Sequence, residues 1–187
     1  LFNYQIAYEI RLQQAMEENL LCPFHYFGIT DLSIIGDAEN ACRDFSMLTS
    51  DERVKHIIGQ ADYYGYSGEK VKGLIFCSSI KETEKLSAKF NQIMNPSTGR
   101  KFRTIALNGN ASESERQAAF ERLAMNDDEA TDDNQPLDYI FSVEILNEGV
   151  DIVEVNQVIM LRPTQSPIVF IQQLGRGLRK AKGKEYV

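Results

Sequence analysis

Residues 73–82 read Gly-Leu-Ile-Phe-Cys-Ser-Ser-Ile-Lys-Glu, and this stretch decides the fold. The uninterrupted run Gly73–Cys77 is typical of a strand that is buried on both faces of a parallel sheet. Ser79 and Glu82 then stand three residues apart, which is the spacing of a capping box at the start of a helix. The apolar residues that follow recur on one face of that helix: Leu86, Phe90 and Ile93. The stretch therefore predicts a strand that leads directly into a helix.

The same alternation continues along the chain. Residues 102–107, 137–143 and 157–161 predict three more strands. A second capping box, at residues 112–115, begins a helix after the second strand, and a last helix begins at Ser166-Pro167. Strands that alternate with helices of about a dozen residues form right-handed βαβ units. We therefore expect an α/β fold in which a parallel sheet lies between helices, in three layers.

The first 69 residues show a different pattern. Residues 5–20 predict a helix and residues 24–29 a strand. A third capping box, at Thr49–Glu52, begins a helix that extends to Tyr64, and residues 65–68 form a turn. We interpret residues 1–69 as a lead-in or inter-domain segment that packs on the core, and residues 70–187 as one domain.

Charge is segregated along the chain. The 187 residues carry a formal net charge of −7, which is unusual for a protein that binds nucleic acid. Five of the acidic residues crowd one polar loop, at positions 127, 128, 129, 132 and 133. Five basic residues lie close together near the end of the chain: Arg176, Arg179, Lys180, Lys182 and Lys184. The net charge therefore does not exclude a local site for phosphate groups.

Composition excludes several other classes of protein. The chain has no apolar run near the roughly 20 residues that cross a bilayer, and no signal-peptide pattern. Its three cysteines are too few and too far apart for a metal site, and their odd number argues against a disulfide framework. We expect no bound metal in this chain and a reducing, cytoplasmic setting.

Polar residues follow the predicted strands where a parallel sheet binds its ligands, beyond the carboxyl ends. They are Ser78 and Ser79 after the first strand, Asn108 and Asn110 after the second, and Ser142 at the end of the third. A helix that begins at such an edge presents backbone N–H groups to an anion. A plain role as the N-cap of the helix explains Ser79 equally well, and both interpretations stay open. Arg116, in the second helix, is expected to pair with a carboxylate.

Two arginines near the end of the chain form the sharpest pattern. Arg176 and Arg179 are three residues apart, so on a helix both guanidinium groups face one target, and a planar guanidinium suits phosphate oxygens. Gln172 lies one turn ahead of Gly175. The alternative is an ordinary surface helix end, where cations are favoured by the helix dipole.

These segments resemble the motifs of superfamily 2 helicases in order and spacing. Gln172-x-x-Gly175-Arg176-x-x-Arg179 resembles motif VI, Asn147–Ile152 resembles motif V, and Leu74–Ser79 resembles motif IV. The resemblance covers residues 71–180 and implies a RecA-like domain. It implies that Arg176 and Arg179 act as arginine fingers on ATP, and that four residues contact the nucleotide: Gln172, Glu148, Gly149 and Asp151. It also implies that Ser78, Ser79, Asn108, Asn110 and Ser142 hold the backbone of a nucleic acid.

Two departures from the family pattern limit what the chain does alone. Many of these helicases have threonine near the start of motif V, where this chain has Ser142-Val143-Glu144. The chain also has no Gly-x-x-x-x-Gly-Lys-[Ser/Thr] loop and no Asp-Glu pair after a strand. We therefore expect an excised fragment, inactive by itself, whose arginines complete an ATP and Mg²⁺ site held by a preceding RecA-like domain.

The expected function is ATP-driven translocation along, or unwinding of, a nucleic acid. DNA is favoured over RNA by overall likeness to restriction- and repair-type helicases. Two alternatives stay open: a double-strand DNA translocase that does not separate strands, and a RecA-like module that binds without hydrolysing ATP.

Overall fold

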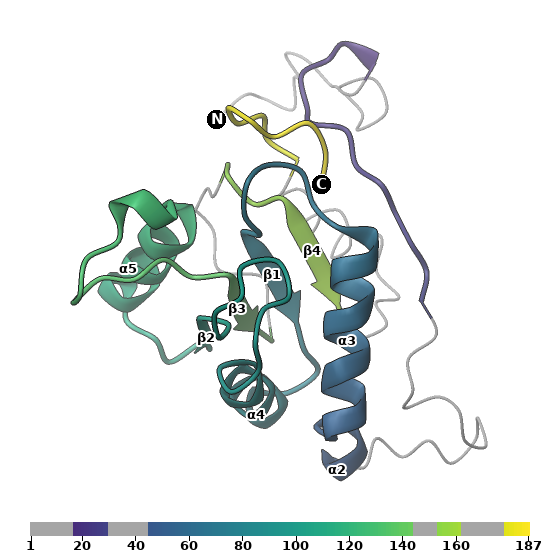
Figure 1. Ribbon diagram of the computed structural model, residues 1–187, viewed down its shortest axis with the longest axis vertical. Helices are drawn as coiled ribbons and strands as arrows, with labels where there is room; N and C mark the ends of the chain where they lie inside the picture. Colours follow the sequence, from purple (N-terminus) through teal and green to yellow (C-terminus); the bar gives the residue numbers. More distant parts are fainter. Residues whose placement is uncertain (1–16, 30–44, 144–152, 162–177) are drawn as a thin grey trace, which may run out of the picture.

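A computed structural model of the chain describes residues 17–29, 45–143, 153–161 and 178–187 (Figure 1). Its centre is a parallel four-stranded sheet with the order β2-β3-β1-β4. The strands are β1 (Gly73–Phe76), β2 (Thr104–Leu107), β3 (Tyr139–Ser142) and β4 (Gln157–Met160). The described helices are α2 (Phe45–Leu48), α3 (Asp51–Tyr64), α4 (Ile80–Phe90), α5 (Glu113–Ala124) and a 3-10 turn, η2 (Asp127–Glu129).

Each face of the sheet carries its own apolar cluster. On one face, Ile75 and Phe141 pack with residues of α3 and α4, among them Ile57 and Phe90. On the other face, Leu74 and Ile140 pack with Phe120 and Leu123 of α5. Figure 1 shows α3 and α4 on one side of the strands and α5 on the other. The prediction of an α/β fold with a parallel sheet between two layers of helices is therefore confirmed.

Helix α3 belongs to this core although it precedes the sheet in sequence. Val54, Ile57 and Ile58 are buried in the same cluster as Ile75 of β1. Ser50 is the N-cap, and its Oγ accepts a hydrogen bond from the backbone N–H of Arg53. The division of the chain at residues 69 and 70 stays a prediction.

A glycine in the central strand makes room for a ring from its neighbour. Gly73 of β1 is in register with Tyr139 of β3 on one side and with Gln157 of β4 on the other. The buried Tyr139 hydroxyl donates to Oε1 of Gln157 at 2.7 Å, so the tyrosine spans the central strand. A Cβ atom on Gly73 would lie less than 3.0 Å from two carbons of that ring. Nε2 of Gln157 in turn donates to the carbonyls of Ala61 and Gly65, at the end of α3.

A second amide side chain connects segments at the amino ends of the strands. Oδ1 of Asn156 accepts from the backbone N–H of Lys72 at 2.8 Å. Its Nδ2 donates to the carbonyls of Ser67 and Lys70 at 2.7 and 2.8 Å. All three groups are buried, so this one side chain satisfies backbone atoms from three positions.

Buried charges also gather at this amino edge. The carboxylate of Asp138 is fully buried and accepts two hydrogen bonds from Arg100, at 2.8 and 2.9 Å, and one from the backbone N–H of Arg103. The ammonium groups of Lys70 and Lys72 donate to the carbonyls of Met125 and Ala124, at the C-terminal end of α5. Burial lowers the pKa of Lys70 to about 8.

Three sequence predictions need correction. Residues 24–29 form no strand, because their backbone bonds lead instead to the end of the chain, where His25 N–H donates to the Val187 carbonyl. The predicted capping box at Thr49–Glu52 is wrong: Ser50 is the N-cap of α3, and the residue three positions after it is Arg53, which has no acceptor to complete a box. Ser79 does cap α4, but its predicted partner Glu82 turns its carboxylate elsewhere. The capping box of Ser112 and Glu115 is confirmed.

The predicted helix over residues 5–20 lies largely outside the described residues, and the one begun at Ser166 lies wholly outside them. No helix in the described part of the chain is long and apolar enough to span a membrane.

Candidate nucleic-acid interface

The polar residues that follow β1, β2 and β3 come together at one edge of the sheet. Phe76, the last residue of β1, is in register with Ser142 of β3, and so is Leu107, the last residue of β2. Ser78, Ser79, Asn108 and Asn110 follow those strand ends within three residues. Helices α4 and α5 begin at the same edge, capped by Ser79 and Ser112. The edge therefore presents two helix N-termini beside exposed polar side chains, an arrangement that suits phosphate groups.

Ser79 serves as the helix cap. Its Oγ accepts from the backbone N–H of Glu82 at 3.3 Å, and its carbonyl accepts from the Thr83 hydroxyl at 2.8 Å. Ser79 is exposed, so its hydroxyl is accessible to solvent. In capping the hydroxyl oxygen accepts a hydrogen bond, whereas in phosphate binding the O–H would donate one, so the two roles are compatible. The second role stays a prediction.

Ser78 is held by a buried carboxylate. Oε2 of Glu82 accepts from the Ser78 backbone N–H at 2.8 Å and from its hydroxyl at 2.5 Å. The other carboxylate oxygen, Oε1, accepts from Arg53 of α3 at 2.7 Å. The side chains of Arg53 and Glu82 are only 1% and 0% exposed. Both donors of Ser78 thus point toward the protein, and its position is fixed by an ion pair between α3 and α4.

Sequence reasoning missed this ion pair. Arg53 and Glu82 are 29 positions apart and lie in two different predicted helices. Nothing in the sequence indicated that these two side chains meet. The only signal in the sequence was a glutamate at the third position of α4, which a capping box explains without any arginine. The guanidinium also donates to the carbonyl of Leu48, at the end of α2.

The turn after β2 leaves amide groups facing outward. Oδ1 of Asn108 accepts from the backbone N–H of Asn110 at 2.9 Å, which closes the turn. Arg116 of α5 donates to the carbonyl of Gly109 at 3.1 Å, so its partner is a backbone carbonyl and the predicted carboxylate partner is wrong. Asn110 is exposed and Asn108 is partly exposed. The Nδ2 groups of both asparagines have no acceptor within the described ranges, so they are available as donors.

Ser142 is more enclosed than the other residues of this edge. It is 4% exposed, and its carbonyl accepts from the Cys77 backbone N–H at 2.8 Å. It is the last residue of β3, and the residues from 144 to 152 lie outside the described part.

The predicted ATP-contacting residues are mostly outside the described ranges. They are Glu148, Gly149, Asp151, Gln172 and Arg176. Arg179 is described and exposed, in a segment at the opposite end of the sheet. In that segment the Leu178 carbonyl accepts from Cys22 N–H at 2.6 Å, and Lys184 donates to the Val155 carbonyl, just before β4. Figure 1 shows residues 178–187 beyond the amino ends of the strands. The structure does not bring this segment to the serines, and the arginine-finger role stays a prediction.

Cations lie along α4 from its first turn to its last. Lys81, Lys85 and Lys89 are spaced four residues apart along this helix, which places them on one face. Lys89 forms a hydrogen bond and ion pair with Asp51 of α3. That hydrogen bond lowers the pKa of the Asp51 carboxyl, and the charges of nearby lysines, Lys55 among them, add to the effect.

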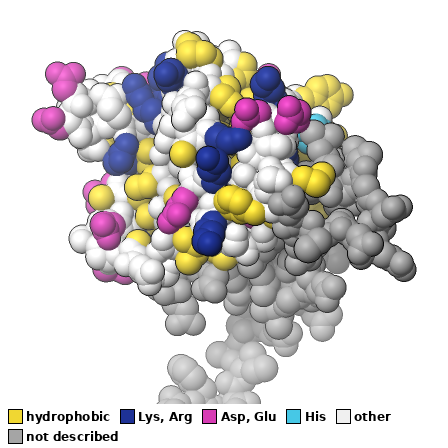
Figure 2. Space-filling model, turned by 90° about the horizontal axis from the view of Figure 1, so that it is seen from below, with side chains coloured by type: hydrophobic (Ala, Val, Ile, Leu, Met, Phe, Trp, Pro, Cys, Tyr) yellow, Lys and Arg dark blue, Asp and Glu magenta, His cyan; other side chains and the backbone are white. Residues whose placement is uncertain are grey.

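Figure 2 shows the molecule from below the view of Figure 1, where α2 and α4 are drawn toward the bottom. Lys and Arg side chains spread across the middle of this face, with Asp and Glu side chains among and beside them. This face therefore carries charges of both signs, with several cations near its middle.

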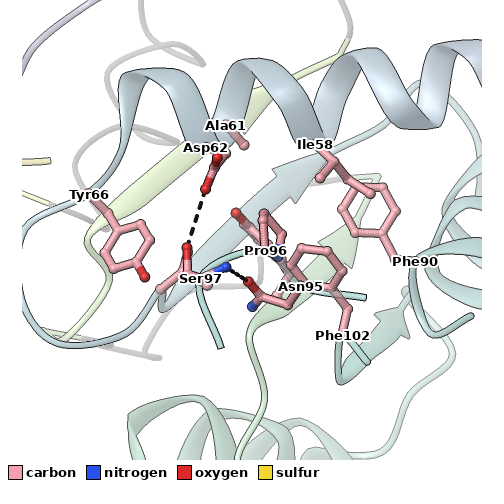
Figure 3. A pocket seen from close by; sticks show the side chains of 11 residues that line it. Ile58, Ala61, Asp62, Tyr66, Phe90, Asn95, Pro96, Ser97 and Phe102 are labelled. Carbon is pink, nitrogen blue, oxygen red and sulfur yellow. Dashed lines mark hydrogen bonds between the residues drawn. The ribbon is translucent and has the colours of Figure 1, made fainter. Parts of the chain in front are cut away.

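A small hollow lies away from this interface. It is shallow, open to solvent, and lies between α3 and the turn after α4 (Figure 3). Ser97 donates to Asp62 across its mouth at 3.3 Å, and Nδ2 of Asn95 is buried there with no hydrogen-bond partner among the described residues. Tyr66 and Tyr139, at the amino side of β1 and β3, also line the hollow. It is therefore not part of the candidate interface.

No group of three His, Cys, Asp or Glu side chains in the described part of the chain could hold a metal ion.

Comparison with known proteins agrees with this geometry. The model of the family "helicase conserved C-terminal domain" matches residues 51–181. No curated protein matches the chain. Among solved structures, the chain is similar to LlaBIII, an ATP-dependent Type ISP restriction-modification enzyme bound to DNA, at 22% identity and a TM-score of 0.58. That similarity covers 92% of this chain and 12% of LlaBIII.

Two DEAD-box proteins have the same fold. One is domain 2 of Mss116p bound to an RNA duplex, at 16% identity and a TM-score of 0.51, over 75% of this chain and 48% of the other. The other comes from the hyperthermophile Methanococcus jannaschii, at 19% identity and a TM-score of 0.51, over 73% of this chain and 32% of the other. The chain thus spans less than half of each of these proteins, and similarities at this level of identity show the fold alone.

Proposed function

Because the chain belongs to the family of helicase conserved C-terminal domains, we propose that it is the second RecA-like motor domain of an ATP-dependent nucleic-acid helicase. The observation that carries the proposal is the register of the sheet, which gathers the polar strand ends and the N-termini of α4 and α5 at one edge. In this proposal the edge holds the sugar-phosphate backbone of one nucleic-acid strand.

In this proposal, nucleic acid is bound by hydrogen-bond donors at this edge of the sheet. The amide groups of Asn108 and Asn110, the hydroxyl of Ser79 and the first backbone N–H groups of α4 and α5 point away from the core at this edge. The lysines on α4 add an attraction that falls with salt. Contacts of this kind position a strand without reading its bases, since most such hydrogen bonds go to phosphate and sugar. This supports binding that tolerates many sequences.

The ATP side of the proposal depends on the residues that resemble motifs V and VI. Glu148, Gly149 and Asp151 sense the nucleotide, while Gln172, Arg176 and Arg179 face its phosphates. The ATP itself and its Mg²⁺ are held by a preceding RecA-like domain. Arginine fingers act by stabilising the charge that develops on the transferred phosphoryl group, typically by a factor of about 10³–10⁵. ATP binding then closes the gap between the two domains and hydrolysis opens it. The two domains therefore bind the nucleic-acid strand tightly in turn, and the motor moves along it.

DNA is the proposed substrate, with RNA as the alternative. The test is ATP hydrolysis by the intact protein with single-stranded DNA, with the matching RNA, and with neither. Stimulation by DNA that exceeds stimulation by RNA supports the proposal. Strand-separation and triplex-displacement assays then distinguish unwinding from translocation along a duplex.

Arg176→Ala tests the motor role itself. The expected result is a loss of stimulated ATP hydrolysis by a factor of about 10³ or more. Lys101→Ala is the matched control, because Lys101 is an exposed cation before β2 and lies outside the segments that resemble the helicase motifs. If Arg176→Ala hydrolyses ATP as fast as the control, the finger assignment is wrong.

A further inference from the structure

The ion pair between Arg53 and Glu82 is unusual in its setting. It is fully buried, yet it stands immediately beneath the exposed edge where β1 ends and α4 begins. Removing two charges from water is costly, and a buried ion pair is weak evidence for a role in stability. A neutral pair of similar volume would join α3 to α4 as well. The charges therefore call for a reason other than packing.

Glu82 fixes the loop that forms the edge. Its Oε2 accepts two hydrogen bonds from Ser78, one from the backbone and one from the hydroxyl. A charged acceptor makes these bonds shorter and stronger than a neutral acceptor would. The consequence is a rigid path from the end of β1 to the first turn of α4, whose N–H groups face outward.

The same carboxylate creates a problem for an anionic ligand. A negative charge beneath the edge repels a phosphate above it, and burial weakens the screening of that repulsion by salt. Arg53 removes the repulsion, since its guanidinium lies 2.7 Å from Oε1 on the side away from Ser78. With both partners present, the negative charge of Glu82 fixes the loop while the positive charge of Arg53 cancels its repulsion of a phosphate.

We infer that Arg53 is a positioning residue for nucleic-acid binding: it neutralises Glu82, so that Glu82 can fix Ser78 without repelling the phosphate backbone at this edge. Arg53 does not touch the nucleic acid. The inference rests on the proposed function and adds to it a residue from α3, outside the motifs on which the resemblance depends.

The test compares three variants of the intact protein: Arg53→Met, Glu82→Gln, and the two combined. The probe is a fluorescently labelled oligothymidylate, with the matching oligouridylate as the RNA counterpart. Binding is measured by fluorescence anisotropy, and thermal unfolding of each variant by circular dichroism. Lys101→Met, at the opposite edge, is the control for loss of a positive charge.

Arg53→Met is expected to weaken binding about tenfold. That factor is what one uncompensated charge produces at roughly 10 Å from a phosphate, at an effective dielectric constant of about 20. The double variant restores binding to within about twofold of wild type, because glutamine still accepts from Ser78 and carries no charge. Lys101→Met binds as wild type.

Glu82→Gln separates positioning from stability. It breaks the ion pair and leaves Arg53 buried without a carboxylate, so its melting temperature falls. Its affinity for the oligonucleotide is nevertheless equal to wild type or higher, because glutamine still accepts from Ser78 and the more positive field at the edge outweighs the weaker hydrogen bonds of a neutral acceptor. A merely structural pair would lower both together. This variant also keeps the inference testable if Arg53→Met does not fold.

Two results overturn the inference alone: unchanged affinity in folded Arg53→Met, or weaker binding in folded Glu82→Gln. If the wild-type protein binds neither oligonucleotide, the proposed function fails and the inference fails with it.

Discussion

Replacing Gly73 by alanine tests how the sheet is assembled. Gly73 is the first residue of β1, and glycine to alanine in a strand normally stabilises by up to about 0.5–1 kcal/mol, because glycine loses more conformational entropy on folding. Here the added Cβ would lie less than 3.0 Å from Cδ1 and Cε1 of Tyr139. Overpacking of this kind costs about 1–3 kcal/mol. If the ring moves to make room, its hydrogen bond to Gln157 is lost as well, at about 1 kcal/mol.

The sum is a net destabilisation of about 2 kcal/mol, which lowers the melting temperature of a chain of this size by about 5 °C. The assay is urea unfolding followed by far-ultraviolet circular dichroism, since the chain contains no tryptophan. Gly59→Ala is the matched control: Gly59 lies in the interior of α3, and a Cβ atom there would meet no other atom within 4 Å. This control is expected to gain about 0.5–1 kcal/mol.

The sign of the change decides the outcome. If Gly73→Ala is as stable as wild type, or more stable, the tyrosine does not need the space above the glycine and the reasoning fails. A double-mutant cycle gives an independent check, because Tyr139→Ala should destabilise less in the Gly73→Ala background than in wild type.

Three further predictions concern the amino edge and α5. Asp138→Ala should cost about 3–5 kcal/mol in urea unfolding, because it leaves the Arg103 N–H and both Arg100 donors without their carboxylate; a loss below about 1 kcal/mol would contradict this. Burial lowers the pKa of Lys70 to about 8, so the unfolded chain binds more protons than the native state between about pH 8 and pH 10. The free energy of unfolding should therefore rise over that range, and the rise should be smaller in Lys70→Met; equal slopes would refute the assignment. Ser112→Ala should cost about 1 kcal/mol by the loss of the α5 capping box, whereas Ser114→Ala, at the second residue of α5, should cost less.

Local patterns in the sequence were sufficient for most of the architecture. A strand buried on both faces is one continuous apolar run, so β1 was predicted at 73–77 and begins at Gly73 and ends at Phe76. The N-caps of α4 and α5 depend on residues within one turn, and both were found. The aromatic run from Phe24 misled because strand propensity is a weak signal when the chain has no neighbouring strand to pair with.

Partners that are distant in sequence could not be predicted. The residue types at the strand ends indicated which polar residues come together, because parallel strands bring their carboxyl ends to one edge; that they bind nucleic acid stays a prediction. Nothing local, however, pairs Arg53 with Glu82, or explains why the central strand starts with glycine. Tyr139 supplies that explanation from 66 residues away in the register of β3, and it requires the three-dimensional arrangement.

The side-chain amide of Asn156 makes hydrogen bonds that a backbone amide makes elsewhere in a parallel sheet. In a parallel ladder, one residue donates its N–H to a carbonyl of the neighbouring strand and accepts from the N–H two residues further along that strand. The Asn156 amide makes this pair of bonds, with the carbonyl of Lys70 and the N–H of Lys72. It thus extends the hydrogen-bond ladder between β1 and β4 just before the first residues of both strands, Gly73 and Gln157. Only an amide has the donor and the acceptor side by side, so aspartate, although it has the same shape, would turn that rung into a repulsion between oxygens. Deamidation of Asn156 would remove the donor to the carbonyls of Ser67 and Lys70 and so weaken this end of the sheet.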